Sequence, residues 1–592
     1  MDDRLATLVP YPANVRRGQG QLELPAKPAV RAGLGAAAGQ LAQVVDRALA
    51  AIPWPRLEPE LRPDDSDVTV TVHAEPALAP EAYELTIDPE GVSIAASGPA
   101  GAFYAAQTLR QLLPDDAFRS ARIESGAAGW HLPAAEIADQ PSLPWRGAHI
   151  DVARHFVTKR ELLALIDALA AMKFNRLHLH LTDDQGWRIE SRRFPRLHEI
   201  GSHRPRTRIS LNGEEPRVYE DIPHGGYYTL DDLAEIASYA ADRMMTLVPE
   251  IDLPGHCAAL LAALPELGAG EPPAGGYQVS ADWGILPYLI SPLPEARAAV
   301  SEILAEVVGA TGARYVHIGG DECVLDSWRA DPRIEAYRRE RGMTTADDLH
   351  AAFLRDIADT LAAEHGARAI VWDEGFTSTA GQRPGLRDDT IVMAWRGMPI
   401  ARAAADAGHE VIATPVFPTY FDYYQERADA EPVAIGGPVR IEDVSAFAPV
   451  PPDWPAEAAR MMIGTQFQVW TEYIPDGRAL EYMIFPRSCA LADVAWAGRP
   501  SAWEATGGGK PPLRDRVSAH LRRLAAAGVE FRPLAGPAPW QEGGTGPRRH
   551  RPGYEIGEVT VHLDQLAAGE QALGESANGG ARLQLTGQEK HA

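Results

Sequence analysis

From Trp145 onward the chain repeats one pattern, in which a short apolar strand is followed by a polar loop and an amphipathic helix. Strands that are apolar on both faces and separated by helices are typical of a parallel sheet covered by helices. The predicted strands are residues 146–153, 175–181, 245–251, 314–319, 368–373, 390–395, 410–414 and 464–470. Eight such units predict an α/β fold, a (β/α)8 TIM barrel with long loops.

Helical patterns separate most of these strands. The predicted helices are residues 158–173, 229–243, 294–310, 347–365, 400–408 and 480–497. One connection departs from the pattern, because residues 375–389 are rich in Gly, Pro and Asp and show no helical periodicity. We therefore expect one barrel unit without a helix.

A smaller α+β domain is expected in front of the barrel, over residues 1–143. Residues 67–74 alternate as a half-buried strand does, and 83–97 read as a hairpin. An amphipathic helix is expected over 100–114, where a proline ends it.

The barrel domain is expected to span residues 144–540, with 520–533 as its closing helix. Residues 541–592 read as a tail or minor appendage, with weak strand character at 556–562 and 581–586.

Composition restricts the possible partners. With 81 acidic and 56 basic residues the net charge is −25, which disfavours nucleic acid and anionic membranes as partners. Three widely spaced cysteines provide neither a disulfide framework nor a zinc ligand set. The N-terminus lacks an apolar signal segment, and no stretch approaches the ~20 apolar residues of a membrane span. We expect a cytoplasmic protein, or a secreted one if a leader is missing.

The carboxyl ends of barrel strands carry the chemistry in such folds. Here they carry acids, tryptophans and one arginine, a combination suited to a sugar, because carboxylates and Arg bind hydroxyls and flat aromatic faces stack on pyranose rings. The residues concerned are Asp151, Arg154, His155, Asp183, Asp184, Gln185, Trp187, Glu250, Asp252, His256, His317, Asp321, Glu322, Trp372, Asp373, Glu374, Trp395, Tyr420, Asp422, Trp470 and Glu472.

A metal-dependent hydrolase is the main rival. His178 and His180 form an H-x-H pair on one strand, so both point to the same face. That interpretation needs further histidines at later strand ends, where tryptophans and acids stand instead. We expect both histidines to be barrel-core residues and predict no metal site.

Five ordered motifs carry a resemblance to a known family. They are WRGAHIDVARHF (145–156), FNRLHLHLTDDQGWRIE (174–190), PEIDLPGHCAAL (249–260), HIGGDE (317–322) and VWTEYI (469–474). Together these resemble the family-20 glycoside hydrolases, the β-N-acetylhexosaminidases, and the resemblance covers about 1–540.

The resemblance implies a retaining exo-β-N-acetylhexosaminidase in which the 2-acetamido group of the substrate is the nucleophile, an exception to the two-carboxylate scheme. It assigns Glu322 as the general acid and base, and Asp321 as the group that holds the acetamido N–H. Tyr420 would donate to the acetamido carbonyl. If residues 321 and 322 continue the strand, their side chains point in opposite directions.

The other assignments follow the same resemblance. The implied substrate-binding residues are Arg154, Asp184, Trp372, Trp395, Asp422, Trp470 and Glu472, with the tryptophans walling the acetamido pocket. The implied supporting residues, which orient the catalytic carboxylates, are Asp183, Asp252, His256 and His317, and Asp184 is an alternative to Asp183 in that role. A carbohydrate with a terminal N-acetylhexosamine is the expected partner, and no cofactor is expected. A catalytically inactive sugar-binding barrel is a further alternative, although such a protein needs no positioned acid.

Overall fold

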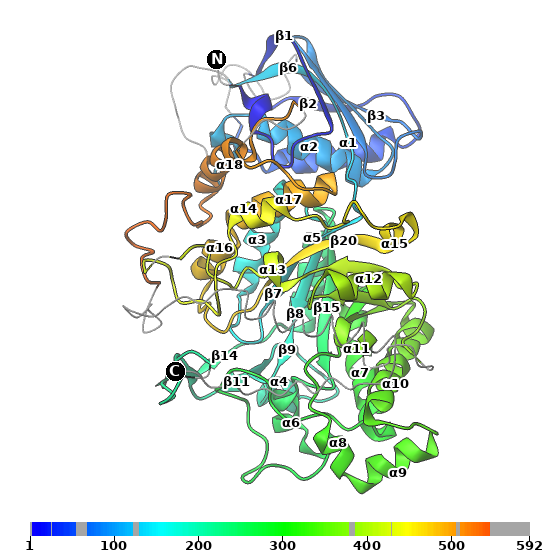
Figure 1. Cartoon of the computed structure of the whole chain (residues 1–592). Helices are drawn as coiled ribbons and strands as arrows, with labels where there is room; N and C mark the ends of the chain where they lie inside the picture. The colour runs from blue at the N-terminus through cyan, green and yellow to red at the C-terminus, as the bar shows by residue number, and fades with distance from the viewer. Residues whose placement is uncertain are drawn as a thin grey trace.

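Eight parallel strands close into a barrel in the computed structural model, which describes residues 3–544 except 25–26, 55–67, 122–129, 213, 378–384, 428 and 505–508. The strands are β7 (Trp145–Asp151), β8 (Arg176–His180), β15 (Thr246–Leu253), β16 (Tyr315–Gly319), β17 (Arg368–Trp372), β18 (Ile391–Ala394), β19 (Val411–Ala413) and β20 (Met462–Val469). Each predicted strand overlaps one of these, and β20 pairs with β7 to close the ring (Figure 1). The predicted TIM barrel is confirmed.

Helices cover the outside of the barrel. They include α3 (Lys159–Ala171), α5 (Leu230–Ala241), α7 (Pro294–Thr311), α10 (Ala346–Thr360), α12 (Met398–Asp406), α16 (Gly477–Ile484) and α17 (Arg487–Ala497). The single helix predicted over 480–497 is wrong, because Pro486, which has no N–H to donate, separates α16 from α17. The prediction that residues 375–389 contain no helix is also wrong in part, because a short helix, α11 (Asp373–Thr377), follows β17 directly.

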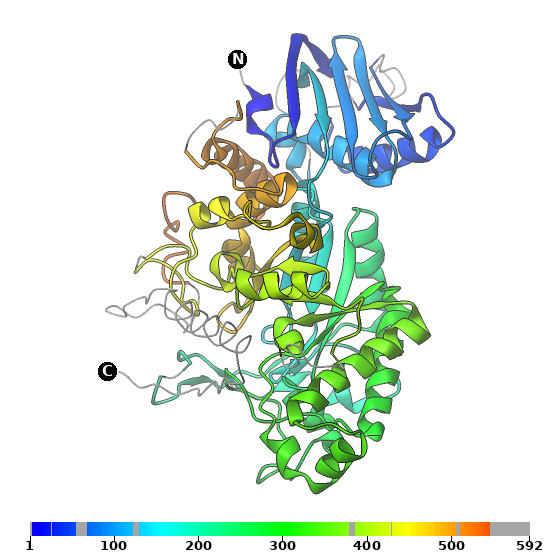
Figure 2. The same ribbon diagram turned by 45° about the vertical axis from the view of Figure 1, so that its right-hand side comes forward.

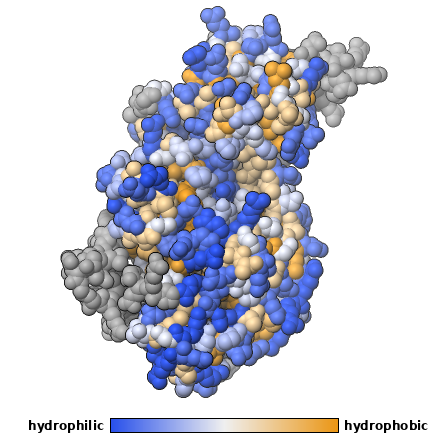
Figure 3. All heavy atoms as spheres, turned by 90° about the vertical axis from the view of Figure 1, so that its right-hand side faces the viewer, coloured by the Kyte–Doolittle hydropathy of each residue, from blue (hydrophilic) through white to orange (hydrophobic). Residues whose placement is uncertain are grey.

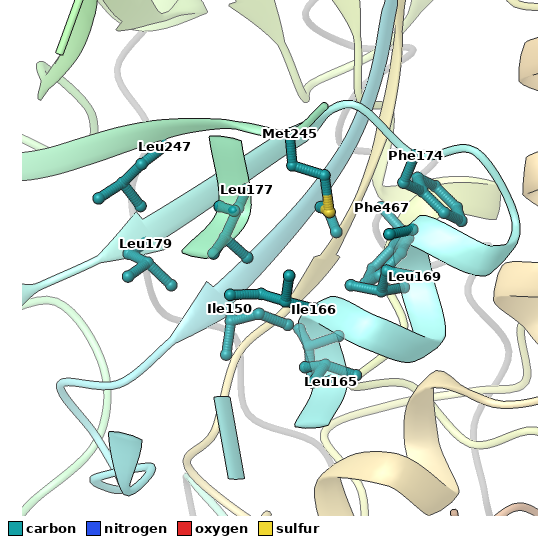
Figure 4. Close-up of a cluster of buried hydrophobic side chains, with 14 of the residues drawn as sticks. Ile150, Leu165, Ile166, Leu169, Phe174, Leu177, Leu179, Met245, Leu247 and Phe467 are labelled. Carbon is teal, nitrogen blue, oxygen red and sulfur yellow. The ribbon is translucent and has the colours of Figure 1, made fainter. Parts of the chain in front are cut away.

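Alternating side chains give the barrel an apolar outside, while its centre holds both apolar side chains and buried histidines. Outward-facing Ile150, Leu177 and Leu179 belong to the buried apolar cluster that α3 joins through Leu165, Ile166 and Leu169, as Figure 4 shows, and all three are fully buried. The opposite faces of the same strands carry His149 and His180 into the barrel, where both are fully buried. The strands that bury apolar surface against helices thus aim histidines at the interior.

In its described residues the N-terminal domain consists of a six-stranded sheet with two α-helices. The strand order is β1-β6-β4-β5-β3-β2. The elements are β1 (Asn14–Leu24), β2 (Ala29–Ala32), α1 (Ala38–Ala50), β3 (Thr69–Ala74), β4 (Tyr83–Asp88), β5 (Gly91–Ala96), α2 (Pro99–Gln111) and β6 (Trp130–Asp139). Figures 1 and 2 show α1 and α2 on the face of the sheet that looks toward the barrel.

The predicted strand, hairpin and helix of this domain correspond to β3, β4–β5 and α2, but β1, β2, β6 and α1 were not predicted. The reason is clearest in β1, whose residues are mostly exposed and polar, so the sequence shows no alternation. The boundaries 1–143, 144–540 and 541–592 remain a prediction, and the weak strands at 556–562 and 581–586 lie outside the described residues.

Buried polar contacts join this domain to the barrel. The Lys173 ammonium lies 3.1 Å from the Asp139 carboxylate, and the Arg146 guanidinium donates to Glu81 at 2.9 Å. The closing helix α18 (Leu513–Ala527) ends before the predicted 533, at Gly528, and its Arg523 donates to the Gln111 carbonyl of α2. On the face shown in Figure 3 hydrophilic residues predominate and hydrophobic ones form small scattered groups.

Candidate active site

The HIGGDE segment leaves β16 in a tight turn. Gly319 and Gly320 have φ values of 68° and 100°, and Glu322 also lies in the left-handed region with φ 49°. The expectation that residues 321 and 322 continue the strand is therefore wrong. Only glycine adopts such conformations at little cost, and a Cβ at position 319 would overlap the Oδ1 atom of Asp252.

Asp183, at the end of the second barrel unit, connects three cationic or imidazole side chains. Its Oδ2 atom lies 2.8 Å from Nη2 of Arg154 and 2.7 Å from Nε2 of His180. Its Oδ1 atom lies 3.3 Å from Nδ1 of His256. Burial would raise the pKa of Asp183, but Arg154 and the two histidines hold it well below its usual range.

His256 links this carboxylate to the HIGGDE turn. Its Nε2 atom lies 3.3 Å from Oε2 of Glu322 and 3.8 Å from Oδ2 of Asp321. Burial alone would lower the pKa of His256, yet the surrounding carboxylates, Asp183 foremost, raise it well above its ordinary value. His256 therefore lies between Asp183 and Glu322 and contacts both carboxylates.

The two carboxyls of the turn differ in exposure. The Glu322 side chain is 31% exposed, whereas that of Asp321 is 12% exposed. Burial, followed by the charge of Asp252, raises the pKa of Asp321 well above its usual value. Burial likewise raises the pKa of Asp252 to about 8. Burial thus favours the protonated form of both Asp321 and Asp252.

Glu250 lies in the barrel centre, and the sequence placed it at a strand end without predicting a role for it. It is fully buried, and the nearest nitrogens of His178, His180 and His317 lie 3.1, 2.7 and 2.8 Å from its oxygens. Burial would raise the pKa of Glu250, but the three histidines hold it well below its usual value. Its i, i+2 spacing from Asp252 on one strand was the signal that could have assigned it to the same face.

His178 and His180 are core residues, as predicted. The Nδ1 atom of His178 lies 3.0 Å from Nε2 of Gln466, and both ring nitrogens of His180 bond carboxylates. His317 uses Nδ1 for Glu250, so His256 and His317 are held by carboxylates as well. These histidines form the floor beneath the HIGGDE turn.

Three tryptophans and Tyr420 gather at neighbouring strand ends. The Trp372 indole donates to Glu250 at 2.9 Å, and the Trp395 indole donates to Glu374 at 2.8 Å. The Tyr420 ring centroid lies 6.4 Å from both the Trp395 and the Trp470 rings. Burial, with the charges of Asp422 and Asp321, raises the pKa of Tyr420 well above its ordinary value, so Tyr420 interacts electrostatically with Asp321.

Arg154 lies close to Trp470 and to several acids. The Arg154 guanidinium lies 5.0 Å from the Trp470 ring centroid and is held by Asp151 and Asp183. Burial, opposed by Arg154, raises the pKa of Glu472, and burial with the Glu472 charge raises that of Asp422 well above its usual value. Glu472 thus interacts electrostatically with both Arg154 and Asp422.

Asp184 lies close to His256. Its carboxylate accepts from the backbone N of Ala258, the first residue of α6 (Ala258–Ala263), and lies 3.6 Å from Nδ1 of His256. The Gln185 side chain, to which no role was assigned, accepts from Nε of Arg154 at 3.0 Å and donates to the Asp282 carbonyl at 2.8 Å. Asp282, in the loop between α6 and α7, thus contacts a residue that binds Arg154.

Four sets of His, Asp and Glu ligand atoms in the described part of the chain lie within 4.8 Å of one another. The sets are His149–His178–Glu250, His180–Asp183–Asp252, Asp183–Asp184–His256 and Asp252–His256–Asp321. Imidazole–carboxylate contacts within this network account for much of the clustering. The absence of a metal requirement remains a prediction.

The described helices include none that is long and apolar enough to cross a membrane.

Comparison with known proteins gives consistent matches over both domains. Residues 143–499 match "Glycosyl hydrolase family 20, catalytic domain" and residues 6–140 match "Glycosyl hydrolase family 20, domain 2". A β-hexosaminidase of Porphyromonas gingivalis is 35% identical over 73% of this chain, and one of Vibrio furnissii is 32% identical over 72%. These matches span 53% and 67% of the two relatives, so the chain covers about half of the first.

A solved structure is similar over most of the chain. The GH20 exo-β-N-acetylglucosaminidase from Vibrio harveyi, in complex with N-acetylglucosamine, has a TM-score of 0.72 and 27% identity. The match covers 89% of this chain and 78% of that one.

Proposed function

The chain belongs to glycosyl hydrolase family 20 and is a glycoside hydrolase, and we propose that it releases terminal β-linked N-acetylhexosamines from non-reducing ends with retention of configuration. The observation that carries this proposal is the pair Asp321 and Glu322 at the end of β16, with His256 in contact with both. An inactive sugar-binding barrel would need the tryptophans and Arg154 but no acid supported in this way.

Glu322 is the general acid in the first step. Its side chain is the more exposed of the pair, so it faces the leaving group and donates its proton to the glycosidic oxygen. The acetamido carbonyl oxygen attacks the anomeric carbon as the bond to the leaving group breaks, which gives a cyclic oxazolinium intermediate. In the second step Glu322 takes a proton from water, the water oxygen bonds to the anomeric carbon, and the ring reopens to the acetamide.

Asp321 and Tyr420 serve the acetamido group. Asp321, more buried, accepts from the acetamido N–H and stabilises the positive charge that develops on the ring. Tyr420 donates its hydroxyl to the carbonyl oxygen and so orients it toward the anomeric carbon. Trp372, Trp395 and Trp470 surround the methyl group.

Arg154, Asp422 and Glu472 bind the hydroxyls of the terminal sugar. The Arg154 guanidinium lies 5.0 Å from the Trp470 ring centroid, and Glu472 interacts electrostatically with Arg154 and with Asp422, which supports one pyranose ring stacked on the indole. Because the Vibrio harveyi relative is in complex with N-acetylglucosamine, we expect a terminal N-acetylglucosamine to be accepted.

The test compares two aryl β-glycosides that differ only at carbon 2. The 2-acetamido substrate should be hydrolysed, and the matching β-glucoside, which lacks nucleophile and pocket contacts, should not. A thiazoline mimic of the cyclic intermediate should bind much more tightly than the product sugar. Asp321→Asn should lose most activity while keeping Glu322 in place.

Rapid cleavage of the β-glucoside, or a fluorosugar trapped covalently on Asp321, would contradict the proposal. Tight binding of the sugar without any hydrolysis would favour the inactive sugar-binding barrel.

A further inference from the structure

Glu374 is an acid beside the acetamido pocket to which the mechanism above gives no role. Its side chain is 17% exposed, and its Oε2 atom accepts a hydrogen bond of 2.8 Å from Nε1 of Trp395. Burying most of a carboxylate is unfavourable unless it is paired and hydrogen-bonded. Here the hydrogen bond that stabilises the Glu374 carboxylate also holds the Trp395 side chain.

We propose that Glu374 is a positioning residue: by holding the Trp395 indole it sets the size of the N-acyl group that the pocket accepts. This inference rests on the proposed function, since it concerns the pocket for the 2-acetamido group. It is separate from the catalytic roles of Asp321 and Glu322.

Two consecutive acids that follow β17 bind Trp395, one through its backbone and the other through its side chain. Asp373 Oδ2 accepts from the backbone N of Trp395 at 2.9 Å and of Arg396 at 3.0 Å. Glu374 then binds the indole nitrogen of the same tryptophan. The backbone is fixed by one carboxylate and the side-chain rotamer by the next.

Arg396 supports this arrangement. Its Nε atom lies 2.6 Å from Asp373 Oδ1 and 3.9 Å from Glu374 Oε2, so a cation offsets both carboxylates. The contact to Asp373 is the closer one, and Glu374 remains directed at the indole. Asp373 therefore fixes the backbone at Trp395 and Arg396, and Glu374 fixes the Trp395 ring.

The held indole faces the rest of the aromatic wall. Trp395 and Tyr420 have ring centroids 6.4 Å apart and planes inclined by 31°. A rotation of the indole would change its distance to Tyr420 and widen the pocket. Without the bond to Glu374, larger N-acyl groups should fit better and the acetamido group should be held less firmly.

The experiment measures kcat and KM of the full chain for aryl glycosides that carry an N-acetyl or an N-propionyl group. Glu374→Ala should lower kcat/KM for the N-acetyl substrate about tenfold, as expected when a partly buried donor loses its partner, and should narrow the preference for N-acetyl over N-propionyl. Glu374→Gln keeps an acceptor oxygen and should restore most of that preference. Exposed Glu364, which follows α10 outside the pocket, provides the control Glu364→Ala.

Trp395→Phe removes the indole donor and gives an independent arm. It should narrow the acyl preference as Glu374→Ala does, and the double variant should add little, because both changes break one bond. An unchanged acyl preference in Glu374→Ala, or equal losses in the Ala and Gln variants, would overturn the inference. If the wild-type chain hydrolyses neither substrate, the proposed function itself fails, which is a different outcome.

Discussion

Asp252 occupies the space that a side chain at position 319 would need. A Cβ built on Gly319 overlaps the Oδ1 atom of Asp252, and the two residues lie on the paired strands β16 and β15. The turn that presents Asp321 and Glu322 is therefore packed directly against a buried acid. The first glycine of HIGGDE is needed for its backbone conformation and also for its lack of a side chain.

Gly319→Ala should consequently abolish most activity and destabilise the fold. The left-handed conformation alone costs an L-residue about 1–2 kcal/mol, and displacing Asp252 adds to that. Hydrolysis of an aryl 2-acetamido glycoside and urea unfolding would measure the two effects.

The matched control is Gly312→Ala. Gly312 has a similar φ of 63°, but a Cβ there meets no atom within 4 Å. The Gly312→Ala variant should lose stability only because alanine is strained in the left-handed backbone conformation, and it should keep its activity. If the two variants behave alike, the close approach of Asp252 is unimportant for catalysis.

Glu322→Gln should remove the proton donor while preserving shape. General acid–base catalysis typically contributes about 10²–10⁴-fold, so we expect a loss of that size or larger for an oligosaccharide. Aryl glycosides with good leaving groups need little protonation and should lose less in the first step. Equal losses for both substrate types, measured as kcat/KM, would argue against Glu322 as the acid.

Chelation should leave activity unchanged. Many histidine nitrogens in the described part of the chain that could bind an ion are directed at carboxylates, as with His180 between Glu250 and Asp183. The assay is hydrolysis before and after dialysis against EDTA. Inactivation that a divalent ion reverses would revive the metal-dependent hydrolase.

Much of the barrel could be predicted because its strands are apolar on both faces, a pattern that is local in sequence. Once the strands are located, the site residues can be placed at one end of the barrel, because the carboxyl ends of parallel strands meet there. β1 lacked any such signal because it is mostly exposed at the edge of its sheet.

The contacts within the site could not be predicted in the same way. Whether Asp183 or Asp184 bonds His256 and Arg154 depends on how the chain turns after β8, and the structure gives both bonds to Asp183. The turn at Glu322 depends on the neighbouring strand, because Asp252 fills the space beside Gly319. Such relationships join residues far apart in sequence.

Asp252 should make stability fall as pH rises. Burial raises its pKa to about 8 in the folded chain, whereas an unfolded Asp titrates near ~3.9. Between these values the folded chain keeps a proton that the unfolded chain has released, so raising the pH favours unfolding by up to about 1.4 kcal/mol per pH unit. Below the lower value both states are protonated, and above the higher value both are ionised, so the effect is confined to that window.

Asp252→Asn removes this titration and should therefore gain stability relative to the wild type as pH rises from 5 to 8. The measurement is the free energy of unfolding in urea at both pH values. Asp453→Asn, the same change at an exposed position before α15 (Ala456–Met461), should show no such trend. If the stability difference between Asp252→Asn and the wild type stayed constant across this range, Asp252 would have to be ionised throughout, and the neighbouring His256 and His180 would then stabilise its charge more than its burial opposes it.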